Sequence, residues 1–285
     1  MRRFPLFGFL LLLPALSLVM LTGCPADKNK TDGAKTGDAG KTGSDGSKTK
    51  VAEKITAPTD GTVIGVVKFD GEATKAVSII NKDHKDFQAC MAGGGNHLID
   101  QKWLVDAKGC VANVLVTLLP VEGKEYDVKA ELKDKWKKNA AILDQPFCAY
   151  TPHIVGIYAG VQPLTIKNSA KIGHNVIIAG GIKNGDTNDN MEPGKVIERG
   201  VFKFVATPVN VSCSVHGWMT SKIVTVDHPY FAVTKEDGSF EIGDVPSGVE
   251  LRVFVWHESF DKAKEAGKVT AKAKEKTSID NLKVK

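Results

Sequence analysis

The seven residues CSVHGWM, from Cys213 to Met219, place three candidate metal ligands in one short stretch. Cys213, His216 and Met219 offer a thiolate, an imidazole and a thioether. Thiolate and thioether sulfur favour Cu(I), whereas imidazole nitrogen suits copper in both oxidation states. Fully extended, the stretch would span ~20 Å, too far for one ion. It must therefore fold into a tight loop, and Gly217 eases the turn.

Three ligands from one loop need a fourth from elsewhere in the chain. The candidate is His174, in the stretch Gly173-His174-Asn175, where one expected strand (163–169) stops and the next (175–181) begins. Two imidazoles, one thiolate and a weakly bound thioether are the ligands of a blue-copper electron-transfer site. Zinc is the alternative metal, but it rarely takes methionine, and its structural sites favour four Cys and His ligands.

The loop CSVHGWM with the upstream GHN resembles the cupredoxins, and its Cys-x2-His-x2-Met spacing looks most like that of the amicyanins. The segment 148–176, CAYTPHIVGIYAGVQPLTIKNSAKIGHNV, is also similar to the first cupredoxin strands. The resemblance covers Leu143 to Val226. It implies one type 1 copper ion with the ligands His174, Cys213, His216 and Met219, the methionine being axial.

The resemblance also assigns two neighbours of these ligands. It implies that Asn175 ties the two ligand loops together by hydrogen bonds near the thiolate, which is a supporting role behind the ligands. It further implies that Gly173 presents its carbonyl toward the metal.

The elements that must position these residues are predicted to be short strands. Stretches rich in Val, Ile, Thr and Phe are punctuated by Gly, Pro, Asn and Asp, which favours an all-β fold built as a β-sandwich. Residues 124–139 are polar with scattered apolar positions and are expected to form a surface helix. Residues 259–276 are charged and weakly patterned, and no element is assigned there. The strand-like stretches are 61–71, 110–120, 153–160, 163–169, 175–181, 201–213, 222–226, 239–245 and 250–258.

A second small β-sandwich is expected beside the cupredoxin-like Greek-key sandwich. Residues 232–258 resemble the second half of a carboxypeptidase-regulatory or transthyretin-like domain, and 63–79 and 109–119 resemble its first strands. This implies a discontinuous flanking domain of residues 57–142 and 227–285, with the copper domain, 143–226, inserted. The alternative is a long N-terminal extension followed by a separate C-terminal module.

The first 23 residues are predicted to be a lipoprotein signal peptide. A charged start, MRR, precedes an apolar stretch that ends in LTGC, the pattern of a secretory signal. LTGC resembles the bacterial lipobox, which implies that Cys24 is lipidated. The chain would then be exported and lipid-anchored to a bacterial membrane, facing the periplasm or the cell exterior. A transmembrane anchor is the alternative, since the stretch is long enough to span.

Residues 24–56 are expected to form a flexible tether. They consist mainly of Lys, Asp, Gly, Ser and Thr, and such a segment cannot bury enough apolar surface to offset its ordering entropy.

The charge balance argues against nucleic acid as a partner. Nine of the 38 Lys and Arg residues and five of the 33 Asp and Glu residues precede Pro58, which leaves 29 basic and 28 acidic residues in the remainder. A nucleic-acid surface needs clustered excess positive charge.

Export implies an oxidising compartment, where thiols tend to pair. If one cysteine carries lipid and Cys213 binds metal, the simplest outcome for the other three is one disulfide and one odd thiol. Cys148 is expected to pair, with Cys90 as the preferred partner. The five cysteines are at positions 24, 90, 110, 148 and 213.

These residues predict a membrane-tethered electron carrier rather than an enzyme. Copper reductases and oxidases resembling this family need further histidines or a second loop cysteine, and Ser212 and Ser214 flank Cys213 instead. The expected partner is a redox protein, such as a cytochrome, an oxidase or a dehydrogenase. The alternatives are a tethered β-sandwich binding module and a copper storage or shuttle protein.

Overall fold

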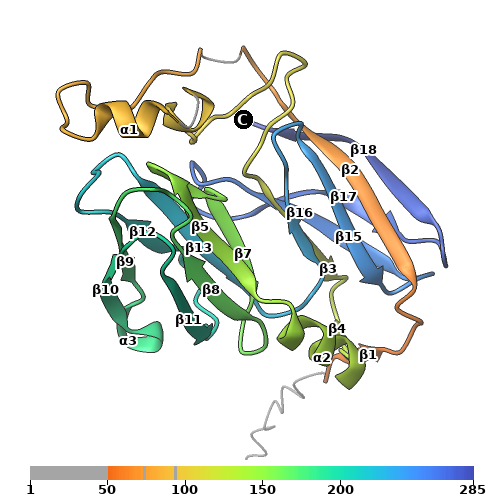
Figure 1. Ribbon diagram of the computed structural model, residues 1–285. Coiled ribbons are helices and arrows are strands. Elements are labelled where there is room, and N and C mark those ends of the chain that lie inside the picture. Colours follow the sequence, from red (N-terminus) through yellow and green to blue (C-terminus); the bar gives the residue numbers. More distant parts are fainter. Residues whose placement is uncertain (1–50, 73–74, 93–94) are drawn as a thin grey trace, which may run out of the picture. The chain divides into compact units, whose positions relative to one another are not determined.

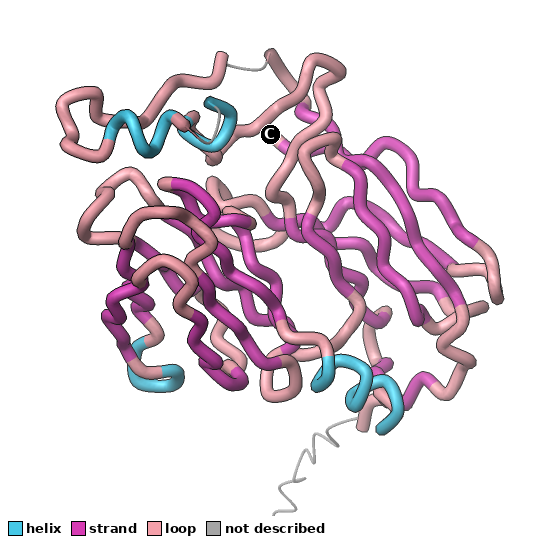
Figure 2. Tube along the Cα trace, in the orientation of Figure 1, coloured by secondary structure: helices cyan, strands magenta, loops and turns pink. Residues whose placement is uncertain are grey.

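Strands dominate the computed structural model, which describes residues 51–72, 75–92 and 95–285 (Figures 1 and 2). Many strands alternate buried and half-exposed residues, as β8 (Pro163–Lys167) does. That alternation places every second side chain on a core face. The all-β prediction is confirmed, and the strands form two β-sandwiches.

The first sandwich consists of a five-stranded sheet, β10-β9-β12-β13-β7, and a four-stranded sheet, β11-β8-β5-β6. One apolar core with residues from both sheets, such as Leu143, Leu164, Ile178 and Ile223, lies within it. A short helix, α3 (Gly181–Asn184), precedes β10. The strands are β5 (Ala141–Phe147), β6 (Ala149–Thr151), β7 (Ile154–Tyr158), β8 (Pro163–Lys167), β9 (His174–Ala179), β10 (Asp186–Met191), β11 (Val196–Val201), β12 (Val209–Ser212) and β13 (Thr220–Val226).

The pairing of β12 brings His174 and the CSVHGWM stretch to the same end of the five-stranded sheet. β12 is antiparallel to both β9 and β13, with Ser212 opposite Ile177 and Thr220. The start of β9 and the end of β12 therefore lie at the same end of the sheet. His174 is the first residue of β9, and Cys213 directly follows β12.

The second sandwich consists of the sheets β14-β3-β16-β17 and β15-β2-β18. Its core includes Val63, Leu118, Ile242 and Val253, all fully buried or nearly so. Its strands come from both sides of the first sandwich in the sequence. They are β2 (Gly61–Phe69), β3 (Leu115–Pro120), β14 (Phe231–Val233), β15 (Ser239–Val245), β16 (Glu250–Trp256), β17 (Lys264–Thr270) and β18 (Lys276–Val284).

Side chains of the two sandwiches also contact each other. A small apolar cluster combines Ile154 and Tyr158 of β7 with Phe231 of β14. Beside it, His153 Nε2 lies 2.6 Å from Glu258 Oε1, and both side chains are largely buried. The two sandwiches belong to one compact unit.

Part of the predicted flexible tether forms a strand. The tether was expected to extend to residue 56, but β1 (Glu53–Ile55) pairs in parallel with β4 (Lys124–Tyr126). Ile55 is 7% exposed and joins the second sandwich's core. This short segment, in which Ile55 is the one buried residue, forms a strand because it pairs with β4, which is distant in the sequence. Local composition does not reveal such a partner.

The helix expected at 124–139 is shorter than predicted. Lys124–Tyr126 forms β4, and α2 extends over Ala130–Lys138, with Lys129 extended before it. The Tyr126 hydroxyl donates a hydrogen bond to the Leu118 carbonyl at 2.7 Å. That contact and the pairing with β1 hold the first residues of this stretch in an extended conformation.

Residues 259–276, to which no element was assigned, contain the edge strand β17. Of its seven residues only Val269 is buried. A strand that pairs on one side and faces solvent does not need apolar alternation, and charged side chains protect such an edge.

The segment between β2 and β3 differs most from the expectation. It contains α1 (Phe87–Met91) and the 3-10 helix η1 (Gly95–Leu98). It was expected to belong to the flanking domain, 57–142, yet Cys90 and Leu98 are buried in the first sandwich's core.

Within the described ranges, no helix is both long and apolar enough to cross a membrane. The predicted signal peptide, residues 1–23, and Cys24 lie outside these ranges.

Candidate metal site

The CSVHGWM stretch is a closed loop between β12 and β13. The Cys213 N–H donates to the Met219 carbonyl at 3.2 Å, and the Met219 N–H donates to the His216 carbonyl at 2.8 Å. These bonds bring the two ends of the loop together. Cys213 is 3% exposed, His216 0% and Met219 1%. The loop therefore turns all three candidate ligands away from water.

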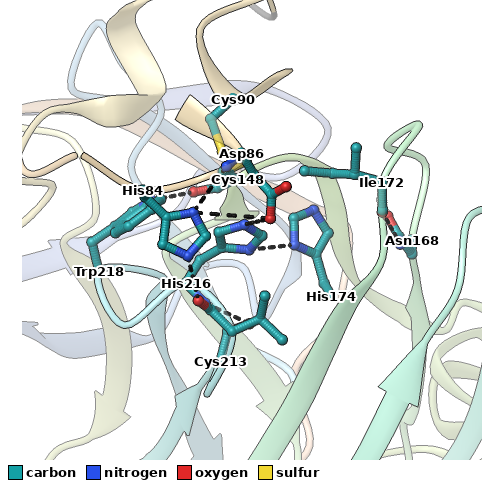
Figure 3. Close-up of a disulfide and its surroundings, with 11 residues drawn as sticks. His84, Asp86, Cys90, Cys148, Asn168, Ile172, His174, Cys213, His216 and Trp218 are labelled. Carbon is teal, nitrogen blue, oxygen red and sulfur yellow. Dashed lines mark hydrogen bonds and ion pairs between the residues drawn. A yellow bond between two sulfur atoms is a disulfide. The ribbon is translucent and has the colours of Figure 1, made fainter. Parts of the chain in front are cut away.

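His174 reaches the same place from the start of β9 and is 3% exposed. The residues before it are braced by Asn168, whose Nδ2 donates to the Ile172 carbonyl at 2.9 Å and the Met191 carbonyl at 2.7 Å (Figure 3). Because Met191 lies opposite His174 in the β9–β10 register, this bracing fixes where the histidine enters the sheet.

The imidazoles of His174 and His216 face each other (Figure 3), and Cys213 joins them in one group of possible ligands. The Nδ1 atoms of the two histidines are 3.0 Å apart. One donor atom from each of the three residues lies within 4.8 Å of the others. Two nitrogens bound to one ion at ~2.0 Å can be no more than ~4 Å apart. The spacing therefore fits both imidazoles on a single metal ion, and a soft sulfur donor beside two imidazoles suits copper.

Both histidines are held in the neutral form that binds metals. Burial lowers the pKa of His174 to about 4, and the neighbouring His216 lowers it too, while Asp86 and the Phe147 backbone oppose the shift. Burial also lowers the pKa of His216, although the hydrogen bond that its ring donates to Asp86 opposes this shift. Each ring therefore keeps a nitrogen lone pair at neutral pH, which a metal ion requires.

Cys213, the third member of this group, is a buried free thiol. The backbone N–H of His216 donates to its Sγ at 3.5 Å. A donor aimed at the sulfur stabilises negative charge there, as a thiolate ligand requires.

Asn175 links the ligand loop to the strand that carries His174. Its Oδ1 accepts the Ser214 N–H at 2.7 Å, and its Nδ2 donates to Asn188 Oδ1 at 2.7 Å. The Tyr150 hydroxyl adds a second tie, because its one proton is shared between the carbonyls of Asn175 at 2.7 Å and Ser212 at 2.9 Å. Burial raises the pKa of Tyr150, so its hydroxyl remains a donor.

Gly173 and Met219, the other two residues expected at the metal, lie close to this group in the chain. Gly173 is exposed directly before His174, where an added Cβ would lie 3.4 Å from Glu192 Oε2. Met219 is buried in the same core cluster as Cys213.

A disulfide joins Cys90 of α1 to Cys148, which lies between β5 and β6. This is the pair preferred from the sequence. The Cys148 carbonyl also accepts the Trp218 Nε1–H at 3.1 Å. The disulfide therefore anchors α1 next to the ligand loop. Cys110, the other free thiol in the described part of the chain, is buried in the region that pairs with β2.

Two residues near the site were not predicted from the sequence. Asp86 Oδ2 lies 3.1 Å from His216 Nε2, and the His84 and His216 ring centroids are 4.9 Å apart (Figure 3). His84, Asp86 and His216 also form a second group with possible metal-binding atoms within 4.8 Å of one another. The signal that could have found them is Cys90, because its expected bond to Cys148 brings the preceding residues toward the loop.

The comparisons with known proteins add little to this geometry. No protein-family model matches the chain, and no curated protein matches it. The chain is similar to the solved structure of a reduced amicyanin mutant, at 21% identity over 31% of this chain and 84% of that chain, with a TM-score of 0.27.

It is also similar to a novel purple cupredoxin from Nitrosopumilus maritimus, at 19% identity over 30% of this chain and 99% of that chain, with a TM-score of 0.26. Because these TM-scores are below 0.5, the likeness carries no argument about function.

Proposed function

We propose that this chain is a type 1 copper protein that transfers single electrons between redox partners. His174, Cys213, His216 and Met219 would hold one copper ion, as their residue types and the loop spacing suggest. The observation that carries the proposal is the pair of Nδ1 atoms 3.0 Å apart beside the buried Cys213 thiol. Copper bound by such donors supplies a one-electron couple.

The protein's own contribution is to fix the donors and exclude water. Asn175 and Tyr150 hold the two ligand segments at a set distance through hydrogen bonds. The ligands are at most 3% exposed. A rigid, dry site reduces the rearrangement that accompanies gain or loss of one electron, because no ordered water or side chain has to move.

The proposed partners are redox proteins, met in weak and transient encounters. Ser214, Val215 and Gly217 of the ligand loop are exposed, Val215 by 39%. These residues flank His216 in the chain, so a partner that contacts them approaches the buried ligands closely. We further propose that lipidation at Cys24 tethers the exported chain to a bacterial membrane, with residues after Cys24 acting as a spacer.

The test is whether the full chain keeps one copper ion through repeated redox cycles. The chain is loaded with Cu(II), cleared of loose metal, and cycled by voltammetry in the presence of a Cu(I) chelator. An electron carrier gives one copper per chain, a reversible one-electron wave and no transfer to the chelator. His174→Ala abolishes the wave.

Two other outcomes would replace the proposal. Loss of copper to the chelator on reduction indicates a storage or shuttle protein, since such a protein must release Cu(I). Absence of stoichiometric copper leaves a tethered β-sandwich binding module.

A further inference from the structure

The segment from Ile79 to Ala92, which we name the cap, lies against the ligand loop although it belongs to a distant part of the sequence. His84 Nε2–H donates to the Val215 carbonyl at 3.1 Å. The disulfide Cys90–Cys148 fixes the other end of the cap. Nothing in electron transfer through the four ligands requires these contacts, so the cap needs its own explanation.

Asp86 makes the cap's direct contact with a ligand. Its Oδ2 lies 3.1 Å from His216 Nε2, on the ring edge opposite the Nδ1 that faces His174 (Figure 3). An ionised carboxylate only accepts hydrogen bonds. The proton of the neutral ring is therefore held on Nε2, and the lone pair remains on Nδ1. Asp86 thus selects the tautomer that a metal ion beside His174 needs, and it also fixes the plane of the ring.

His84 supports this arrangement instead of binding metal. Its Nδ1 accepts the Asp86 backbone N–H at 3.2 Å, and its Nε2–H is used by the Val215 carbonyl. Both ring nitrogens are therefore satisfied by the protein. The ring also packs at 4.9 Å from His216 and 5.2 Å from Trp218, between centroids. A histidine used in this way braces Asp86 and covers His216.

The disulfide holds the carboxylate in place. The Cys90 N–H donates to the Asp86 carbonyl at 2.9 Å, so the two residues share one turn of α1. Cys148, the partner of Cys90, accepts the Trp218 Nε1–H through its carbonyl. A continuous chain of bonds thus leads from Asp86 through the disulfide to the ligand loop.

We infer that Asp86 is a positioning residue for the copper site, held in register by the Cys90–Cys148 disulfide, and that it sets the tautomer and orientation of His216. The inference rests on the proposed function for the role of His216 as a ligand. The tautomer itself is a property of the metal-free chain. The two claims therefore fail separately.

The test compares Asp86→Ala and Asp86→Asn with Asp83→Asn in the full chain. Asp83 is exposed in the same segment, three residues away, and among the described residues no hydrogen bond or ion pair joins its side chain to His216. Asparagine at 86 keeps an acceptor oxygen without the charge, whereas alanine removes the acceptor. The first readout is the ¹⁵N spectrum of the His216 ring in the metal-free protein, and the second is copper affinity by chelator competition.

The expected result is an Nε2–H tautomer of His216 in the wild type and in Asp83→Asn, and a mixture of tautomers in Asp86→Ala. Copper affinity falls ~10–100-fold in Asp86→Ala, the usual cost of removing a group that orients a metal-ligating histidine, and falls less in Asp86→Asn.

An unchanged tautomer together with unchanged affinity in Asp86→Ala overturns the inference. If the wild type binds no copper, the proposed function fails, and the metal-free ¹⁵N spectra still decide whether Asp86 orients His216.

Discussion

The Nδ1 atoms of His174 and His216 lie 3.0 Å apart although 42 residues separate the two histidines in the sequence. β9 carries the first, the β12–β13 loop carries the second, and the β9–β12 pairing brings them to one edge. Burial lowers the pKa of both rings, so neither is charged at neutral pH. In the metal-free chain the two facing Nδ1 atoms share one hydrogen bond, and a metal ion bound by both would replace its proton.

Metal binding should stabilise the fold through this pair. Copper at 100 times its Kd stabilises a protein by about 2.7 kcal/mol, which corresponds to a rise in Tm of about 5–10 °C for a chain of this size. Thermal unfolding followed by circular dichroism, with and without copper, should show this rise in the wild type and lose it in His216→Ala.

His97→Ala is the matched control. His97 is half-buried and stacks on Phe147 at 4.2 Å between ring centroids, outside the ligand set. The copper-dependent rise in Tm should persist in His97→Ala. An equal rise in His216→Ala would mean that copper binds elsewhere.

Replacing Asn175 should lower the free energy of unfolding more than replacing its hydrogen-bond partner Asn188. Asn175→Ala removes the acceptor of the Ser214 N–H and should lower the free energy of unfolding by about 1–2 kcal/mol. Asn188→Ala removes only the outer bond to Asn175 and should cost under about 1 kcal/mol, because Asn188 is exposed. Urea unfolding of the metal-free chains measures both. Equal losses would show that Asn175 does not hold the ligand loop.

The disulfide and Asp86 should act as one unit. Cys90→Ala with Cys148→Ala opens a loop of 58 residues and should cost about 2–4 kcal/mol of stability. If the disulfide acts on copper through Asp86, adding Asp86→Ala should reduce copper affinity little further. A double-mutant cycle of copper affinities measures this coupling. Fully additive losses would mean that the two features act independently.

His257 should make the fold sensitive to mild acid. Burial lowers its pKa to about 4 from an ordinary 6.5. Its Nδ1 accepts the Ser259 N–H and its Nε2–H faces the Lys102 carbonyl at 2.6 Å, so a second proton would break a bond. The unfolded chain binds the proton more readily. The contribution of neutral His257 to the free energy of unfolding is therefore complete above pH 6.5 and decreases as the pH falls toward 4.

The size of this effect follows from the shift. A pKa lowered from 6.5 to about 4 corresponds to about 3 kcal/mol in total, at about 1.4 kcal/mol per unit. Urea unfolding at pH 7 and pH 4.5 should show a loss that is about 2–3 kcal/mol smaller in His257→Gln than in the wild type. Identical losses would show that His257 is not the titrating group.

The candidate ligands could be picked out from the sequence because their chemistry and spacing are local. Cys213, His216 and Met219 share one loop, and a short loop between paired strands leaves few ways to arrange them. His174 could be added because it begins a strand with a clear apolar pattern. The structure brings His174, Cys213 and His216 within reach of one another.

The position of the cap could not be predicted because its contacts join residues that are distant in the sequence. Asp86 and His216 are 130 residues apart, and the cap has neither strand alternation nor helical periodicity. Its place depends on a disulfide and on contacts of His84 and Asp86 with the ligand loop. The parallel strand β1 was missed for a similar reason, since its pairing with β4 is set by tertiary contacts and not by its own residues.

The most direct test of the central claim is the visible absorption spectrum of the full chain loaded with one equivalent of Cu(II). The wild type should show an intense thiolate-to-copper charge-transfer band in the visible region. Cys213→Ser should lose the band, whereas Cys110→Ser, which removes the other buried free thiol, should keep it. Copper bound without the band, or a band that persists in Cys213→Ser, would contradict a type 1 site at Cys213.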